Sequence, residues 1–248
     1  VCQGQNTVAY SVPTITNATG YNWVLPAGTT IASGNNTNSI TVNFANNAAS
    51  GVITVTGTNT CGSGNISADF PYTVNQISIA PTSISGTTTI CTGNSTTLTA
   101  VSGTLGTGAN YQWGTGNIVG TNPITGETNA AISVSPTVTT NYWVRIENNA
   151  YPCISTTTGV SQLVTVENLV DSAGTISGDG TVCQGQNSVA YSVPAITNAI
   201  GYVWTLPTGA TIATGDNTNS ITVNFANNAT SGVITVTGTN TCGSGTTS

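Results

Sequence analysis

VCQGQNTVAYSVP, residues 1–13, returns as VCQGQNSVAYSVP at residues 182–194. The likeness continues without a gap, because residues 1–67 match residues 182–248 at 55 of 67 positions with a constant offset of 181. We call these two stretches the first copy and the second copy. Self-similarity at a fixed period is typical of a tandem array, and this period exceeds the usual length of one small domain. The repeating unit therefore contains more than one domain.

Both copies alternate apolar with polar residues, which is the pattern of half-buried β-strands, and no helical periodicity of useful length interrupts it. Clusters of Gly, Asn and Pro separate the alternating runs at turn positions. The expected inward faces of the first copy are Val8, Tyr10 and Val12, then Tyr21, Trp23 and Leu25, then Ile40, Val42 and Phe44, then Ile53 and Val55. With the flanking runs, about seven strands fit in roughly 85 residues, as in an Ig-like sandwich.

The segment between the copies carries its own alternating runs and predicts a further sandwich of similar size. We expect domains at residues 1–75, 76–169 and 170–248. The first and last are expected to be incomplete, because the lead strand at 173–180 has no counterpart before Val1 and the closing strand at 68–75 has none after Ser248. The predicted fold class is all-β, with three tandem β-sandwich domains in an extended array.

Each predicted domain carries an aromatic-x-Trp sequence. It lies on the second alternating run after the first Cys of that domain. The three tryptophans are Trp23, Trp113 and Trp204. A buried Trp on the third strand is typical of such sandwiches, so we interpret all three as core residues, with ligand stacking as the alternative.

Six cysteines fall at matched separations, one pair to each predicted domain. We expect Cys2 with Cys61, Cys91 with Cys153, and Cys183 with Cys242. The first and third pairs have equal sequence separations, and that of the second pair is nearly the same. No Cys-x-x-Cys spacing and no His is present, so disulfides are favoured over zinc. Disulfides indicate an oxidising, extracellular setting.

Charged residues make up 3% of the chain, with one Arg, no Lys, no His and seven carboxylates. General acid and base catalysis draws on side chains that are scarce or missing here, so we expect no enzyme activity, no cofactor and no metal. A net charge of −6 disfavours nucleic acid, whose binding depends on clustered Lys and Arg. No apolar run reaches the length of about 20 residues that a membrane-spanning helix needs.

The residues above resemble a known group of repeats. The two copies are similar to PKD-like domains, although Trp23-Val-Leu-Pro-Ala-Gly28 and Trp204-Thr-Leu-Pro-Thr-Gly209 depart from the acidic stretch of true PKD domains. The middle segment resembles Ig-like domains with a Ser-Pro-Thr signature, here Ser135 to Tyr142. Such domains alternate in large cell-surface proteins of Bacteroidota exported by the type nine secretion system, including adhesins of gliding motility.

This resemblance implies a cell-surface, extracellular protein whose repeats form the stalk or filament of an adhesin in gliding motility or surface attachment. The implied partners are neighbouring repeats of the same chain and an extracellular surface or polysaccharide. The alternative is that the domains are carbohydrate-binding or spacer modules appended to a secreted enzyme.

Two further features lie outside this frame. On the strand at 142–147, alternation places Trp143 outward beside Arg145, which suggests a surface contact with a neighbouring domain or a glycan. Ser172, in Asp171-Ser-Ala173, matches an Asp-Ser/Thr-small pattern on which Bacteroidota O-glycosylate secreted proteins, with an ordinary linker turn as the alternative.

Overall fold

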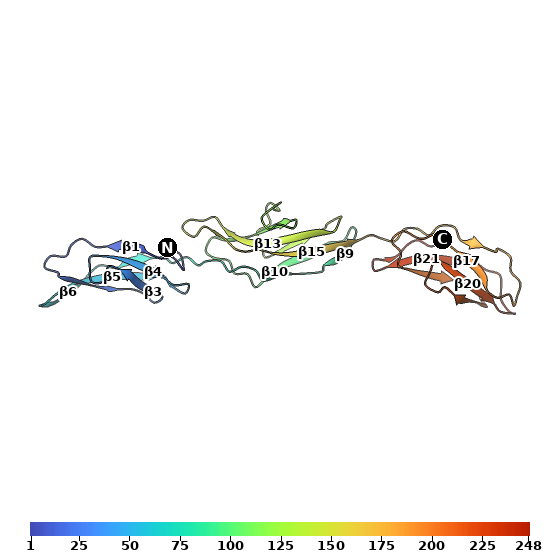
Figure 1. Cartoon of the computed structure of the whole chain (residues 1–248), viewed down its shortest axis with the longest axis horizontal. Coiled ribbons are helices and arrows are strands. Elements are labelled where there is room, and N and C mark those ends of the chain that lie inside the picture. The colour runs from blue at the N-terminus through green and yellow to red at the C-terminus, as the bar shows by residue number, and fades with distance from the viewer. The chain divides into compact units, whose positions relative to one another are not determined.

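The structure is a computed structural model that describes all 248 residues. Its regular elements are 22 β-strands, with no helix, arranged in six sheets (Figure 1). The all-β prediction is confirmed. The chain divides into two compact units: residues 1–85, 99–132 and 141–162, and residues 86–98, 133–140 and 163–248. Each unit is described by itself.

The first copy lies in the first unit and forms two sheets. One has the order β1-β4-β3 and the other β2-β5-β6, with β7 also paired to β5 (Figure 1, blue). Val42, at 0% exposure, is in the middle of the core between them. The strands are β1 (Val8–Ser11), β2 (Gly20–Val24), β3 (Thr29–Ser33), β4 (Ser39–Phe44), β5 (Gly51–Asn59), β6 (Gly62–Ile66) and β7 (Phe70–Tyr72).

The second copy lies in the second unit and repeats this architecture. Its sheets have the orders β16-β17-β20-β19 and β18-β21-β22. Val223 and Val236, both fully buried, lie in its core. The strands are β16 (Ser177–Gly178), β17 (Val189–Ser192), β18 (Gly201–Thr205), β19 (Ala210–Thr214), β20 (Ser220–Phe225), β21 (Thr235–Asn240) and β22 (Gly243–Ser244).

The strands between the copies form the remaining two sheets, and their residues are shared between the two units. The orders are β12-β10-β8 and β11-β13-β15-β9, with β14 on the edge of β13. β9 pairs with β15 in parallel, whereas β11 and β14 pair with β13 and β8 pairs with β10 in antiparallel ladders. The strands are β8 (Ser83–Ser85), β9 (Thr89–Cys91), β10 (Thr96–Val101), β11 (Asn110–Thr115), β12 (Ala131–Val134), β13 (Thr140–Asn148), β14 (Ser155–Thr156) and β15 (Val160–Glu167). The division of the chain at residues 75 and 169 stays a prediction.

The closing strand β7 belongs to the first copy alone. It pairs with Gly51–Ile53 at the start of β5, and Tyr72 packs edge-on against Phe44 with 5.4 Å between ring centroids. In the second copy a groove of about 580 Å³, lined by Phe225, Ile234 and their neighbours, lies at the corresponding place. There β21 begins only at Thr235, because the residues before it have no strand to pair with.

The lead strand β16 belongs to the second copy alone. It pairs with β17, and Ala173 and Ile176 pack onto the core of that copy. In the first copy a groove of about 400 Å³ occupies the corresponding place, lined by Tyr10, Trp23, Phe70 and their neighbours.

The lead strand explains why the three predicted core tryptophans differ in burial. Trp113 and Trp204 are 0% and 8% exposed, whereas Trp23 is half-buried beside the open groove. All three indole nitrogens donate to a backbone carbonyl at 2.9 Å, namely those of Asn129, Thr218 and Thr37 respectively. The hydrogen bond therefore does not depend on complete burial of the ring.

The groove beside Trp23 predicts that a lead strand will stabilise the first copy. Placing residues 170–181 directly before Val1 lets Ile176 fill the groove, and burying one such side chain is worth about 1.5–3 kcal/mol. The thermal midpoint of the first copy should rise by at least about 4 °C. Scanning calorimetry measures it, with Ile176→Ser in the added segment as the control, and an equal rise in both chains would contradict the packing argument.

Candidate functional sites

The structure contains two disulfides, and neither has the predicted pairing. Cys2 bonds to Cys153, and Cys91 bonds to Cys242, with Cα–Cα distances of 5.7 and 5.6 Å. Both bridges span a sequence separation of 151 residues. Cys61 and Cys183 are free and exposed. The predicted pairs within single domains are therefore wrong, and each bond instead joins parts of the chain that belong to different predicted domains.

Cys2 and Cys91 each lie beside the segment that closes their sandwich. Cys2 forms a parallel bridge with Asn75, and the Gln3 amide donates to the Asn75 carbonyl at 3.0 Å. Cys91 pairs with Glu167 in the parallel ladder of β9 and β15. Each of these cysteines therefore sits where the chain leaves its sandwich.

The second cysteine follows the end of a long central strand. Cys61 follows β5 after one intervening residue, and there the Asn59 side chain accepts from the Cys61 amide at 2.8 Å and donates to the Asn17 carbonyl at 2.9 Å. Cys242 follows β21 in the same way, with Asn240 in the place of Asn59.

The length of β5 explains why Cys2 and Cys61 do not pair. Cys2 lies near the Gly51 end, since Gln3 donates to Ala48 at 3.5 Å, while Cys61 follows the other end at Asn59. Nine residues of strand span roughly 30 Å at about 3.3 Å per residue. A disulfide needs Cα atoms within about 7 Å.

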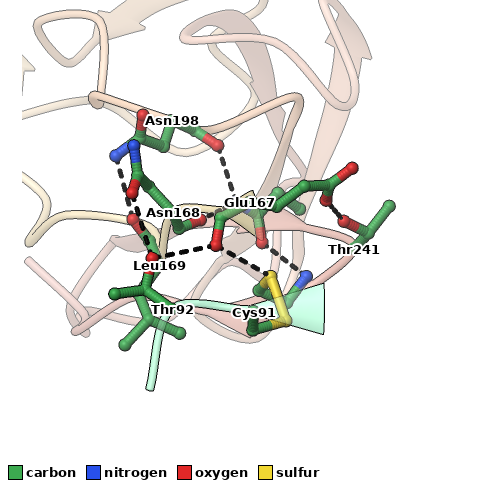
Figure 2. The surroundings of a disulfide bond; sticks show 9 residues. Cys91, Thr92, Glu167, Asn168, Leu169, Asn198 and Thr241 are labelled. Carbon is green, nitrogen blue, oxygen red and sulfur yellow. Dashed lines mark hydrogen bonds between the residues drawn. A yellow bond between two sulfur atoms is a disulfide. The ribbon is translucent and has the colours of Figure 1, made fainter. Parts of the chain in front are cut away.

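Figure 2 shows the bridge in the second unit, beside the connecting residues Glu167–Leu169. The Glu167 carbonyl accepts from the Thr92 amide at 2.8 Å, and its carboxylate accepts from the Thr241 hydroxyl. Asn240 donates to the Asn168 carbonyl at 2.9 Å. Asn198 donates to the Leu169 carbonyl at 3.0 Å. The connection is thus held by polar contacts on both sides of the Cys91–Cys242 bond.

The bridge in the first unit lies beside the connection that follows β7. Gln76 and Thr107 exchange two hydrogen bonds of 3.0 Å, and the Ile77 amide donates to the Gln3 side chain at 3.4 Å. Asn148 donates to the Thr107 carbonyl at 3.0 Å, and so joins the turn before Cys153 to the same network. Both disulfides therefore clamp a connecting segment, and we call them the junction bridges.

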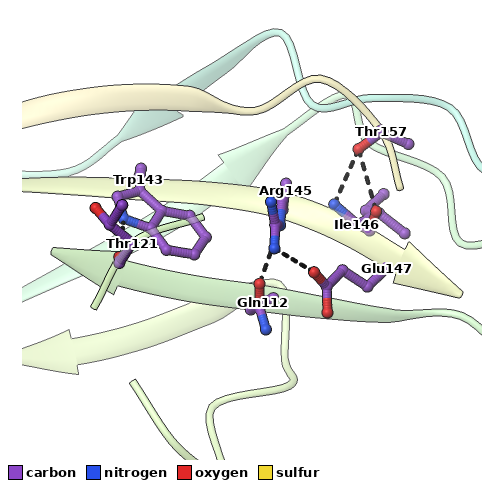
Figure 3. Close-up of polar contacts among 7 residues, drawn as sticks. All are labelled: Gln112, Thr121, Trp143, Arg145, Ile146, Glu147 and Thr157. Carbon is purple, nitrogen blue, oxygen red and sulfur yellow. Dashed lines mark hydrogen bonds and ion pairs between the residues drawn. The ribbon is translucent and has the colours of Figure 1, made fainter. Parts of the chain in front are cut away.

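Trp143 is buried, so the prediction of an outward, exposed indole is wrong. Its exposure is 0%, and its ring nitrogen donates to the Thr121 carbonyl at 2.9 Å (Figure 3). The same nitrogen also donates to the Thr115 carbonyl at 3.2 Å. Gly114 lies opposite Trp143 in the ladder, and any Cβ on Gly114 would overlap the indole. The missing side chain leaves room for the ring, and the segment after β11 folds back over it.

Arg145 caps the same cluster and is only partly exposed. Its guanidinium carbon lies 5.4 Å from the Trp143 ring centroid, and it donates to Gln112 at 3.0 Å and pairs with Glu147 (Figure 3). The one basic side chain of the protein is therefore engaged inside its own sheet. Its proposed role in a contact with another molecule stays a prediction.

Ser172 lies in irregular chain between β15 and β16, and it is exposed. The neighbouring Asp171 amide donates to the Thr197 carbonyl at 3.2 Å. The hydroxyl is thus accessible on a held backbone, and its glycosylation stays a prediction.

Burial raises the pKa of four tyrosines. Desolvation is the main cause for Tyr10, Tyr72, Tyr142 and Tyr191. The pKa of Tyr191 is raised further by the nearby Asp179, whose backbone carbonyl accepts from the Tyr191 hydroxyl at 2.9 Å. The Tyr72 hydroxyl also donates to the Ala49 carbonyl at 3.3 Å, so this partly buried phenol keeps a polar partner.

No group of three or more His, Cys, Asp or Glu side chains is placed to hold a metal ion. No helix has the length and apolar character to cross a membrane.

The family model for the PKD-like domain matches residues 1–70 and 169–248, which include both copies and the lead strand β16 of the second. The chain belongs to the PKD-like domain family. The PKD-like resemblance of the two copies is thereby confirmed. No curated protein matches the chain in sequence.

Among solved structures, the chain is similar to titin domains, a marsupial T cell receptor and the Escherichia coli adhesin FdeC. The titin structure has 13% identity and a TM-score of 0.43, over 100% of this chain and 91% of that one. The receptor has 14% identity and a TM-score of 0.46, over 98% and 95%. The adhesin has 13% identity and a TM-score of 0.35, over 94% and 82%. With TM-scores below 0.5, these likenesses decide nothing about function.

The junction bridges predict that Cys2 and Cys61 respond differently to replacement. Cys2→Ser removes a bond that closes a loop of 151 residues, so unfolding of the first unit should become easier by about 2–5 kcal/mol. Cys61→Ser, the matched control, should change stability by less than about 0.5 kcal/mol because that thiol is free and exposed. Denaturant titration of the oxidised protein measures both, and equal losses would contradict the assigned pairing.

The cluster of Gly114 and Trp143 predicts a strong response to one added methyl group. Gly114→Ala places a Cβ against the indole and should cost about 1–3 kcal/mol through overpacking. Gly64→Ala is the control, since its nearest contact would be 3.6 Å away. Urea unfolding followed by tryptophan fluorescence distinguishes them. Indistinguishable midpoints would show that Trp143 is not fixed over Gly114.

Proposed function

We propose that the chain is part of the stalk or filament of an extracellular bacterial surface adhesin, in which the repeats provide reach and mechanical strength rather than chemistry. The finer proposal is a Bacteroidota adhesin exported by the type nine secretion system and used in gliding or attachment. The PKD-like family and the two disulfides support an extracellular repeat role.

The observation that carries this proposal is the position of the junction bridges. A connection between sandwiches is ordinarily the most mobile and exposed part of such a chain. Here Cys2–Cys153 and Cys91–Cys242 each place a covalent bond beside a connection, in parallel with the backbone. A force along the chain is then borne by two covalent routes at each connection, which suits a tether.

The bridges also limit how far the chain can be drawn out. With both bonds intact, the shortest covalent route from Cys2 to Cys242 runs through the bridges and the segment between Cys91 and Cys153. Without the bridges, the route includes every residue from Cys2 to Cys242. At about 3.5 Å per extended residue, these routes span roughly 220 and 840 Å.

Single-molecule pulling from the two termini measures this limit. The oxidised chain should reach a final extension of about 220 Å between Cys2 and Cys242, and the same chain in reductant about 840 Å. An oxidised chain that extends to the reduced length would show that the bridges do not bear the load and would remove the mechanical basis of the proposal.

The cellular role needs a separate experiment. An antibody raised against this chain should label structures outside intact cells in electron micrographs, and label confined to the cell interior would contradict the proposal. A glycan array with the isolated chain provides the second arm. Saturable binding to a polysaccharide would favour the alternative of a carbohydrate-binding module over a stalk.

A further inference from the structure

Cys61 and Cys183 are the two cysteines without a bond, yet each has a bonded equivalent in the other copy. At the constant offset between the copies, Cys61 corresponds to Cys242 and Cys183 corresponds to Cys2. Cys242 and Cys2 are the PKD-like ends of the two junction bridges. The chain therefore contains one bonded and one free example of each type of cysteine.

The free cysteines are held in the same local frames as the bonded ones. The Cys183 amide donates to the Gln186 side chain at 2.9 Å, as Cys2 does to Gln5 at 2.9 Å. The Cys61 amide donates to the Asn59 side chain at 2.8 Å. The equivalent distance from Cys242 to Asn240 is 2.7 Å. These turns therefore have the same hydrogen bonds whether or not the cysteine is bonded.

The bonded and the free cysteines differ in what their neighbouring residues contact. Asn240 donates both to Asn198 and to the Asn168 carbonyl of the incoming connection, whereas Asn59 donates only to Asn17. Thr241 donates to Glu167, and its equivalent Thr60 has no such carboxylate partner. The hydrogen-bond donors of a junction are therefore present around Cys61, but there is no connecting segment for them to bond.

The surface at Cys183 is incomplete in the same sense. Beside Cys2, the Gln3 side chain accepts from the Ile77 amide of the outgoing connection at 3.4 Å, and Asn75 pairs with Cys2 itself. Gln184 still donates to Ala229 at 2.9 Å, but its oxygen has no amide of this kind to receive. The surface at Cys183 therefore matches the Cys2 side of a junction, but without the connecting segment.

We propose that Cys61 and Cys183 each form a junction bridge with a domain of the type predicted at residues 76–169. Cys61 bonds to a cysteine equivalent to Cys91 in a preceding domain, and Cys183 bonds to one equivalent to Cys153 in a following domain. Each partner lies 151 residues away, as in the two observed bonds. Every domain is then joined covalently to both of its neighbours. The inference does not depend on an adhesin role.

The bond forms by oxidation of two thiols. The two sulfur atoms join, and two protons and two electrons pass to the disulfide of a thiol–disulfide oxidoreductase, which becomes a dithiol by exchange through a mixed disulfide. The exposure of both free thiols gives such an enzyme access.

The test extends the complete chain by one domain. Residues 68–169 are repeated directly after Ser248, with Ile154→Val in the added part as a mass tag on an exposed residue. After oxidative refolding, thiols are alkylated and the protein is digested without reduction for peptide mass spectrometry. The Cys2 and Cys183 peptides differ at Thr7 and Ser188, so each bond can be assigned.

We expect Cys183 to be bonded to the added equivalent of Cys153 in at least about nine of ten molecules. The control chain keeps Cys183 and carries Cys153→Ser in the added domain alone. Cys183 should be alkylated in that chain. A mirror chain with residues 76–181 repeated before Val1 should protect Cys61 instead. Alkylated Cys183 in the first chain, or Cys183 bonded to Cys61 within or between chains, would overturn the proposal.

Discussion

A covalent bond beside a connecting segment is the constraint on which the rest of this structure depends. Cys2 and Cys91 are placed by closing strands that run parallel to them, at Asn75 and Glu167. Cys153 and Cys242 are placed by turns that an asparagine side chain holds, Asn148 and Asn240. The first cysteine of a sandwich lies at one end and the second cysteine at the other. The first can therefore bond only to the sandwich that follows, and the second only to the sandwich that precedes. The β-sandwich thus determines that the bridges join neighbours.

The side chains that hold the connections beside these bonds are uncharged apart from Glu167, in keeping with a chain that is 3% charged. Amide and hydroxyl groups of Asn, Gln and Thr make the contacts, and they pair with backbone groups that would otherwise be unsatisfied in an irregular segment. Such neutral hydrogen bonds are worth only about 0.5–1.5 kcal/mol each, but they are not screened by salt as surface ion pairs are. A connection fixed in this way suits an exterior environment of variable ionic strength.

The alternation of apolar residues was sufficient to predict the all-β fold and the faces of β1, β2 and β4, because a period of two dictates which side of a strand is buried. It failed at Trp143, since alternation cannot show that Gly114 leaves a space on the other face or that the following segment covers it. The disulfide pairing failed for a different reason. Equal separations within the two copies suggested bonds inside domains, but Cys2–Cys153 and Cys91–Cys242 are equally separated too, at 151. The nine-residue length of β5 keeps Cys2 and Cys61 apart, and the sequence separations do not show this.

The central claim is that the junction bridges fix the connecting segments, and amide hydrogen exchange of those segments tests it most directly. In the oxidised protein, the amides of Asn75, Gln76 and Thr92 should exchange as slowly as those of strand ends, because each donates to a partner held by a bridge. Reduction of both disulfides should speed their exchange by at least about tenfold while Val42 and Val223 in the cores stay protected. Exchange at these connections that is already as fast as in an unfolded peptide, or that does not change on reduction, would contradict the account.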